Sequence, residues 1–301
     1  MRCLDGRGPR LANTSRMAEP VTQSISRSSQ AVLPGEPIQR KTWREVGFKV
    51  FVRANRMLLP GRRESGPFWL LAGKPFSINE VAQLLGCGRL ELLLRVREFF
   101  RDDTFRRHLE DVLASSKGVF EAIALLYAIC RTLRPRIVVE LGVASGVSSA
   151  IVLFAMRKNQ HGQLISVDLP NYDKAWVDAV VAKEGRIPGR SFVDNSVPED
   201  KGSGWAVPTD LRNRWELILG DTRDVLPGLL SRIEEVDLAL HDSDHSSGAV
   251  FEEGFALWSK LRDGGLLIVD DIDVSKGFDQ LSERLAWRQR IVVGRVGILK
   301  K

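Results

Sequence analysis

After Arg134-Pro135, short β-branched runs alternate with helical segments through the rest of the chain, and this alternation constrains the fold more than any other feature. Strands are predicted at 136–141, 163–168, 215–219, 236–241 and 265–270, with helices near 147–158, 172–184, 223–232 and 248–262. This pattern is typical of a parallel sheet with helices on both faces. A helix near 278–288 and two β-rich runs around a Gly-Arg turn predict a C-terminal antiparallel hairpin. We therefore expect a doubly wound, mostly parallel seven-stranded α/β sheet.

The chain before this sheet is predicted to be a helical extension. Ser77-Ile-Asn-Glu80 is a capping box ahead of an apolar pattern, and helical stretches follow around 88–100 and 116–133. We place the helical N-terminal extension at 41–115 and the main domain at 116–301. Within that domain, residues 185–213 are rich in Gly and Pro and too long for a simple connector, which predicts a lid or a substrate loop.

The positive charge of the chain belongs to its N-terminal part. Residues 1–64 contain 13 Lys/Arg and 5 Asp/Glu, so the rest carries a small net negative charge although the whole chain is at +6. Residues 1–40 lack apolar periodicity and are predicted to be a disordered leader, with Met17 a second candidate start. Trp43 to Leu59 form an amphipathic basic helix, which either packs on the domain or touches an anionic membrane as a peripheral contact. A basic face with interleaved aromatic residues is missing, which argues against nucleic acid as a partner.

Composition sets the class of protein and the compartment that we expect. The 301 residues are 44% hydrophobic and 27% charged, as in ordinary globular proteins, and no apolar run approaches the roughly 18 residues of a transmembrane segment. The three cysteines are far apart and form no CxxC pair, which favours the cytoplasm, with the inner face of the membrane as the alternative. The sequence does not define the oligomeric state, and a homo-oligomer is among those it allows.

The ligand crevice of an open α/β sheet lies outside the carboxyl ends of its strands, so the residues there are the candidates for a site. The first strand ends in an acid, Glu140, followed by a small-residue loop with Gly142 and Gly146. This spacing is not GxGxxG, and an acid beside the loop would repel a pyrophosphate but suits a ligand with an ammonium and a sulfonium. It favours S-adenosylmethionine over NAD. The donor-site residues predicted in this stretch are Glu140, Gly142, Ala144, Ser145, Gly146, Ser148 and Ser149.

The next two strands end in further acids. Asp168 ends the second strand and could accept hydrogen bonds from both ribose hydroxyls, or it could be only a helix cap. Asp221 and Thr222 follow the third strand, where Asp221 could meet an adenine amino group. Each signal is weak alone, and their common place at the strand ends strengthens them.

Acids also gather after the fourth and fifth strands, in "HDSDHS" and "VDDID". Asp242, Asp270 and Asp271 would converge without a basic partner, and Mg²⁺ would relieve their repulsion; solvated loop acids are the alternative. Such a metal could orient an acceptor hydroxyl and lower its pKa. Asp244 or His245 could then take the proton, although Asp244 could only support the loop and His245 could be structural. Asp242 is also predicted to contact the cofactor.

With these residues in place, residues 116–301 resemble class I S-adenosylmethionine-dependent methyltransferases, specifically the catechol-type and sugar O-methyltransferases. Five ordered blocks carry the resemblance: "VVELGVASGVSSA", "LISVDLPN", "GWAVPTDLRNRWELILGDTRDVLPGLL", "HDSDHSS" and "LRDGGLLIVDDID". The resemblance implies that Asp242, Asp270 and Asp271 bind Mg²⁺ and that Asp244 is the base. It also places the chain near a bacterial branch that modifies polysaccharides or antibiotic sugars.

Three departures from that family bear on the base, the acceptor and the metal. Asp244 stands where many members of the branch have an apolar residue, and Ser247 stands where many have an aromatic one. Asp271 stands where catechol-type enzymes tend to have asparagine. The sequence thus predicts an O-methyltransferase that acts on a hydroxyl of a sugar or another small polyhydroxylated acceptor, either free or part of a glycan. The alternatives are a docking protein that binds S-adenosylmethionine without turnover and an NAD-dependent oxidoreductase.

Overall fold

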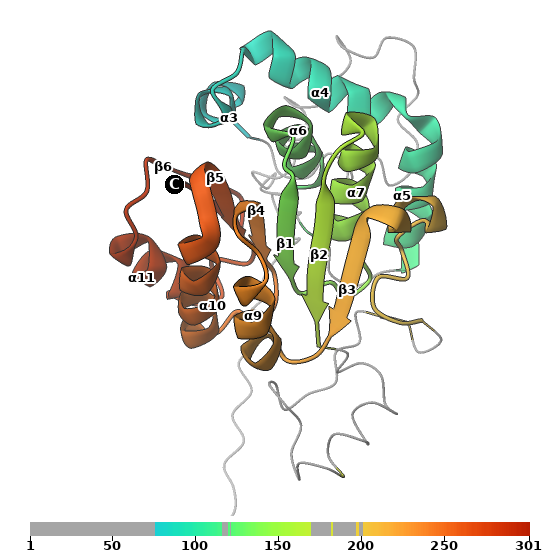
Figure 1. Cartoon of the computed structure of the whole chain (residues 1–301). Coiled ribbons are helices and arrows are strands. Elements are labelled where there is room, and N and C mark those ends of the chain that lie inside the picture. The colour runs from blue at the N-terminus through green and yellow to red at the C-terminus, as the bar shows by residue number, and fades with distance from the viewer. Residues whose placement is uncertain (1–75, 116–119, 121, 170–181, 183–196, 199–200) are drawn as a thin grey trace, which may run out of the picture. The chain divides into compact units, whose positions relative to one another are not determined.

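A seven-stranded sheet organises the chain, with strand order β3-β2-β1-β4-β5-β7-β6 (Figure 1). The computed structural model describes residues 76–301 apart from 116–119, 121, 170–181, 183–196 and 199–200. These residues all belong to one compact unit, Thr42–Lys301. The strands are β1 (Ile137–Leu141), β2 (Gln163–Asp168), β3 (Trp215–Leu219), β4 (Val236–His241), β5 (Leu261–Val269), β6 (Gln289–Val293) and β7 (Val296–Lys300).

The first five strands are parallel, and β7 inserts antiparallel between β5 and β6. This order confirms the predicted doubly wound sheet and its C-terminal hairpin. The predicted strands agree closely with the observed ones except at β5, which begins earlier, at Leu261. A register shift between β4 and β5 accompanies that early start. The predicted leader and the basic helix at 43–59 lie outside the described residues, as do nearly all of the helix near 172–184 and part of the 185–213 loop.

Helices cover both faces of the sheet, as Figure 1 shows. They are α3 (Ile78–Leu85), α4 (Arg89–Arg101), α5 (Asp103–Ser115), α6 (Ile123–Leu133), α7 (Val147–Asn159), the 3₁₀ helix η1 (Thr209–Arg214), α9 (Thr222–Ser231), α10 (Ser247–Lys260) and α11 (Gly277–Arg284). The predicted helix at 116–133 begins only at Ile123 as α6, and α5 was not predicted as a separate helix. The predicted cap is confirmed in part, because Ser77 Oγ accepts a hydrogen bond from the Glu80 amide at the start of α3.

Two hydrophobic cores follow from the alternation of side chains along the strands. Val138 and Leu164 belong to the core that α3 to α7 cover. Their neighbours Val139 and Ile165 belong to the opposite core, beneath α9, α10 and α11. Continuously apolar strands are expected of a parallel sheet buried on both faces, and the near-complete burial of β1, β2 and β4 agrees.

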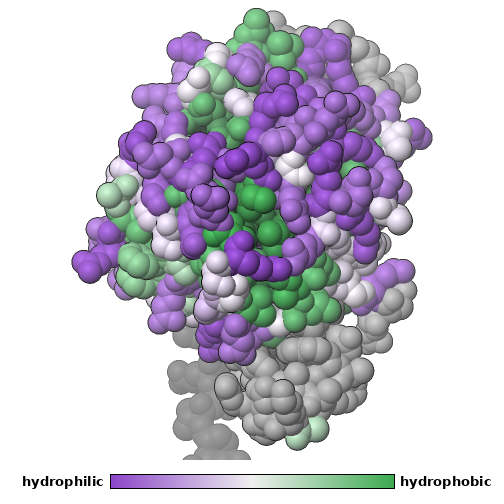
Figure 2. Space-filling view, in the orientation of Figure 1, coloured by the Kyte–Doolittle hydropathy of each residue, from purple (hydrophilic) through white to green (hydrophobic). Residues whose placement is uncertain are grey.

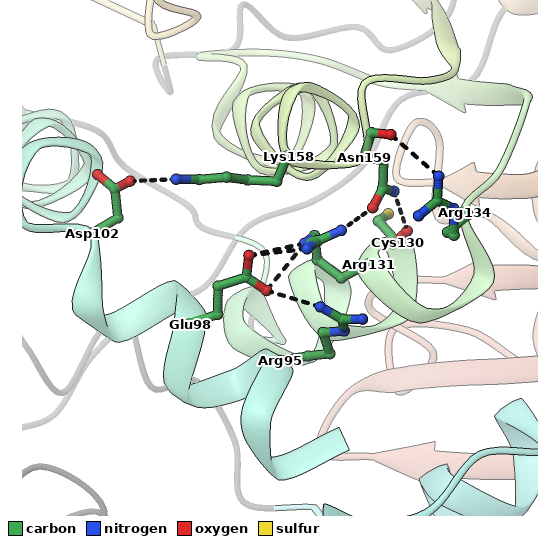
Figure 3. A network of polar contacts seen from close by, with 8 residues as sticks. All are labelled: Arg95, Glu98, Asp102, Cys130, Arg131, Arg134, Lys158 and Asn159. Carbon is green, nitrogen blue, oxygen red and sulfur yellow. Dashed lines mark hydrogen bonds and ion pairs between the residues drawn. The ribbon is translucent and has the colours of Figure 1, made fainter. Parts of the chain in front are cut away.

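A polar network ties α4, α6 and α7 together (Figure 3). Glu98 of α4 accepts hydrogen bonds from the Arg131 guanidinium of α6, and the Arg131 Nη2 to Glu98 Oε1 distance is 3.0 Å. Arg131 also donates to Asn159 at the end of α7, and Asn159 donates to the Cys130 carbonyl at 2.9 Å. Since Arg131 is nearly buried, this satisfied charge holds the helical extension in one register on the domain.

The helices in the described part of the chain are too short or too polar to cross a membrane.

Candidate functional site

The loop after β1 is shaped by contacts with other backbone segments. Gly142 has φ of +85°, and a Cβ there would come within 2.0 Å of the Asp242 carbonyl oxygen. Gly146 has φ of +87°, and a Cβ there would lie 2.6 Å from Gly204 Cα. Ala144 also has positive φ, and its carbonyl accepts from the Gly204 amide at 2.8 Å. Both glycines are therefore required by the close packing of this loop against two neighbouring loops.

Glu140 is buried under this loop and held by three serine hydroxyls. Ser148 and Ser149 at the start of α7 and Ser166 of β2 each donate to its carboxylate at 2.6 Å. Burial raises the pKa of Glu140, and the three hydrogen bonds oppose that rise. The structure thus places Glu140, Ser148 and Ser149 against one another. In this arrangement they support the loop from within the core, where the sequence analysis placed them on the cofactor.

Asp168 at the end of β2 faces the same loop from the other side. Its Oδ1 accepts from the amides of Val143 at 2.9 Å and Ala144 at 3.3 Å, while Oδ2 accepts from the Ser203 hydroxyl. The predicted ribose-binding acid therefore also fixes the backbone of the glycine loop. Ser203 was not identified from the sequence, because it lies 35 residues from Asp168 in a Gly-rich segment without a local signal.

Asp221 is the N-cap of α9. It accepts from the Arg223 amide at 2.9 Å, and its carboxylate is paired with the Arg223 guanidinium at 2.7 Å. The next residue, Thr222, donates to Glu253 of α10. Glu253 also lies 2.9 Å from His241 Nε2 and accepts from Ser243 at 2.7 Å. Burial would raise the pKa of Glu253, but the contact with His241 outweighs it and holds that pKa below its usual range.

Carboxylates gather at the ends of β4 and β5, as the sequence predicts. Burial raises the pKa of Asp242 well above its usual range, and the nearby carboxylates of Asp270 and Asp271 raise it further. His245 Nε2 lies 3.7 Å from Asp242 Oδ1 and 3.7 Å from Asp271 Oδ2. Asp244 turns toward the start of α10, where it accepts from the Ser246 amide at 2.9 Å.

The premise that this carboxylate group has no basic partner is wrong. Arg295, in the turn between β6 and β7, pairs with Asp271 at 3.1 Å and with Asp273 at 2.7 Å. The hairpin was predicted, but its place in the sheet was not. Because β7 runs antiparallel beside β5, the turn before β7 lies at the carboxyl end of β5, next to the acids.

The arrangement of these side chains does not fit the predicted Mg²⁺. Hard oxygen ligands are present, as Mg²⁺ requires. However, in the part of the chain that the structure describes, no group of three or more His, Cys, Asp or Glu side chains is arranged to hold a metal ion. The Arg295 guanidinium also forms an ion pair with Asp271, one of the three predicted ligands. Arg295 offsets part of the negative charge of the cluster in this geometry.

A pocket of about 570 Å³ opens at the carboxyl ends of β1, β2, β3 and β4. Its walls include predicted site residues from four strand ends: Gly142, Ala144, Asp168, Asp221, Thr222, Asp242 and Asp244. Leu226 and Ala256 add apolar wall from α9 and α10. The remaining predicted residues lie outside the wall: Glu140, Ser145, Gly146, Ser148, Ser149, His245, Asp270 and Asp271. On the face drawn in Figure 2, hydrophobic surface likewise gathers in the middle and hydrophilic residues border it.

Residues 139–272 match the model of a family described as a methyltransferase domain. This segment is therefore similar to a methyltransferase domain. It begins in β1 and ends just after β5, so it contains every strand end that lines the pocket. The sheet, with its antiparallel β7, has the Rossmann-like methyltransferase fold expected from the sequence. No curated protein matches the chain.

Solved structures with a similar arrangement include several O-methyltransferases. A putative O-methyltransferase from Klebsiella pneumoniae is 18% identical, with 66% of this chain and 90% of that chain covered and a TM-score of 0.45. The O-methyltransferase TomG from Streptomyces achromogenes, involved in tomaymycin synthesis and solved with S-adenosylmethionine, is 17% identical, with coverage of 86% and 99% and a TM-score of 0.44. These similarities are too low to transfer an activity or a substrate to this chain.

Proposed function

We propose that this chain transfers the methyl group of S-adenosylmethionine to a hydroxyl of a small polyhydroxylated acceptor such as a sugar. The similarity of residues 139–272 to a methyltransferase domain supports this class of reaction. The observation that supports this cofactor is the acidity of the pocket, where Asp168, Asp221 and Asp242 line one cavity. S-adenosylmethionine brings a sulfonium, an ammonium and a ribose diol. Carboxylates attract the two cations and accept hydrogen bonds from the diol.

The glycine loop supports this cofactor over NAD. In a dinucleotide site, the loop amides and the helix N-terminus hold a pyrophosphate. Here the amides of Val143 and Ala144 donate to Asp168 instead. A pyrophosphate would have to displace that carboxylate, and Asp244 adds another acid to the pocket wall. The oxidoreductase alternative is disfavoured on both counts.

The reaction proposed is a direct displacement at the methyl carbon. The acceptor oxygen forms the new C–O bond as the C–S bond breaks, and the products are a methyl ether, S-adenosylhomocysteine and a proton. The sulfonium charge is neutralised in this step, so the protein mainly holds the two reactants in line and removes the proton. We assign the base to Asp244, because it lines the pocket, whereas His245 lies outside its wall against Asp242 and Asp271.

Calorimetry with S-adenosylmethionine, followed by detection of S-adenosylhomocysteine with sugar acceptors, tests the proposal. Asp244→Asn should bind the cofactor as the natural chain does but lose about 100-fold or more in transfer rate, the usual contribution of a general base. The matched control is Asp279→Asn, which changes an exposed acid of α11 that pairs with Arg290 of β6, and it should keep the full rate.

The same measurements separate the alternatives. Cofactor binding without transfer to any acceptor would favour the docking protein, and no binding at all would return the oxidoreductase to consideration. Mg²⁺ is not part of the proposal, because the carboxylate cluster does not fit it in this geometry. Transfer should therefore continue in the presence of a chelator, and its loss there would bring the metal back.

A further inference from the structure

Arg295 is fixed to the loop after β5 by both its side chain and its backbone. Its guanidinium bridges Asp271 and Asp273. Its carbonyl oxygen accepts a hydrogen bond from the Ile272 amide at 2.9 Å. It follows Gly294, whose φ of +62° closes the two-residue turn between β6 and β7. The tip of this hairpin is therefore anchored on the loop that carries the strand-five carboxylates.

The residue that Arg295 holds has an unusual backbone. Asp271 has φ of +53°, in the left-handed region that residues other than glycine seldom adopt. Such a conformation persists only where the surroundings determine it. The Asp271 side chain is held by Arg295, and the next amide donates to the Arg295 carbonyl. Arg295 thus holds both the side chain of Asp271 and the amide of the residue that follows it.

The charges around Asp271 call for a cation at this place. The carboxylate of Asp242 interacts electrostatically with Asp270 and with Asp271 at the adjoining strand end. Carboxylates that interact in this way repel one another when ionised, unless a positive group is nearby. Arg295 supplies a permanent positive charge, since a guanidinium stays protonated in proteins.

We propose that Arg295 is a positioning residue of the methyl-transfer site. It fixes Asp271 and supplies the positive charge that a divalent cation would otherwise bring to Asp242, Asp270 and Asp271. This inference rests on the proposed function for its purpose, but its test does not depend on that function.

The test is titration of the full chain with Mn²⁺ alone, followed by paramagnetic resonance. Arg295→Ala and Arg295→Gln remove the charge, and Gln keeps most of the bulk and a hydrogen-bond donor. Both should bind Mn²⁺ at least about tenfold more tightly than the natural chain, because a fixed positive charge a few ångström away no longer repels the ion. Adding Asp242→Asn to either variant should abolish the gain. Arg295→Lys, which keeps the charge, should behave like the natural chain.

Arg290→Ala is the matched control, because Arg290 is on the same hairpin but pairs with Asp279 of α11. It should leave Mn²⁺ binding unchanged. A purely structural role for Arg295 would lower the melting temperature without any gain in Mn²⁺ affinity, and that result would overturn the proposal. Tight Mn²⁺ binding by the natural chain that Asp242→Asn removes would also overturn it. Cofactor binding, measured separately, reports on the proposed function alone.

Discussion

Gly142 lies in the glycine loop after β1, at the point where this loop packs against the end of β4. The Cβ of any other residue there would meet the Asp242 carbonyl, which is backbone and cannot rotate away. The same Asp242 lines the pocket, so a shift of this backbone would move a site residue. A glycine is therefore required here because the ends of β1 and β4 pack closely together. It affects a ligand indirectly, through the position of Asp242.

Gly142→Ala should destabilise the protein by about 2–4 kcal/mol, through left-handed strain and the backbone clash together. It should also weaken S-adenosylmethionine binding, because the loop must move away from Asp242. Gly228→Ala is the control, since that glycine is exposed within α9 with open space around it. It should stabilise by about 0.5–1 kcal/mol. Urea unfolding and calorimetry measure both, and equal stability of the two variants would contradict the explanation.

Some residues of the site could be identified from the local sequence, and others could not. The aspartates after β2, β4 and β5 were predicted because strand ends are visible in the sequence and acids there converge. Arg295 was missed because its contact with Asp271 depends on where β7 inserts. Glu140 was predicted to face the ligand. Side chains alternate between the two faces of β1, and that of Glu140 points toward the start of α7.

At the scale of elements, one buried carboxylate fastens three neighbouring strands at their amino ends. Asp237 of β4 accepts from the Arg136 amide at 2.8 Å and the Ile137 amide at 2.9 Å, at the start of β1. It also accepts from Arg262 of β5. Burial would raise the pKa of Asp237, but these amides and the guanidinium outweigh it and hold that pKa below its usual range.

A lowered pKa makes the contribution of Asp237 dependent on pH. The folded value lies below the unfolded value of about 3.9, so the stabilisation is complete above that pH and is lost as the pH falls through the folded value. Asp237→Asn should cost about 1–3 kcal/mol at pH 7. The difference from the natural chain should shrink below about pH 4. Urea unfolding at several pH values measures this, and Asp263→Asn, an exposed acid, should show no such trend.

The elements themselves were largely predictable from the sequence, for a physical reason. Buried parallel strands must be apolar on both faces, so each appears as a short β-branched run between helices. The exceptions occurred where that signal fails. β5 begins in "LRDGG", whose charged and glycine residues resemble a loop, yet Leu261 still pairs with Val236 of β4. The boundary between α4 and α5 falls at Asp102, within a charged stretch that offers no break in periodicity.

At the scale of the whole molecule, the helices before Arg134 and the sheet share one core. Phe99 of α4 lies 5.2 Å, centroid to centroid, from Tyr127 of α6, and Tyr127 lies 5.5 Å from Phe154 of α7. Lys300 of β7 donates to the Leu84 carbonyl at the end of α3. The helical extension therefore contributes to the stability of the sheet that carries the site.

This sharing predicts that residues 76–301 unfold as one cooperative unit. Phe99→Ala should remove about 3–5 kcal/mol from the core under α4 and α6, and Leu281→Ala about 2–5 kcal/mol from the core under α11 on the opposite face. Both side chains are almost fully buried. If the two faces depend on each other, both variants lower the same guanidinium transition, and circular dichroism and tryptophan fluorescence coincide. Two separate transitions, with Phe99→Ala moving only one of them, would show instead that the extension folds on its own and that the pocket does not need it.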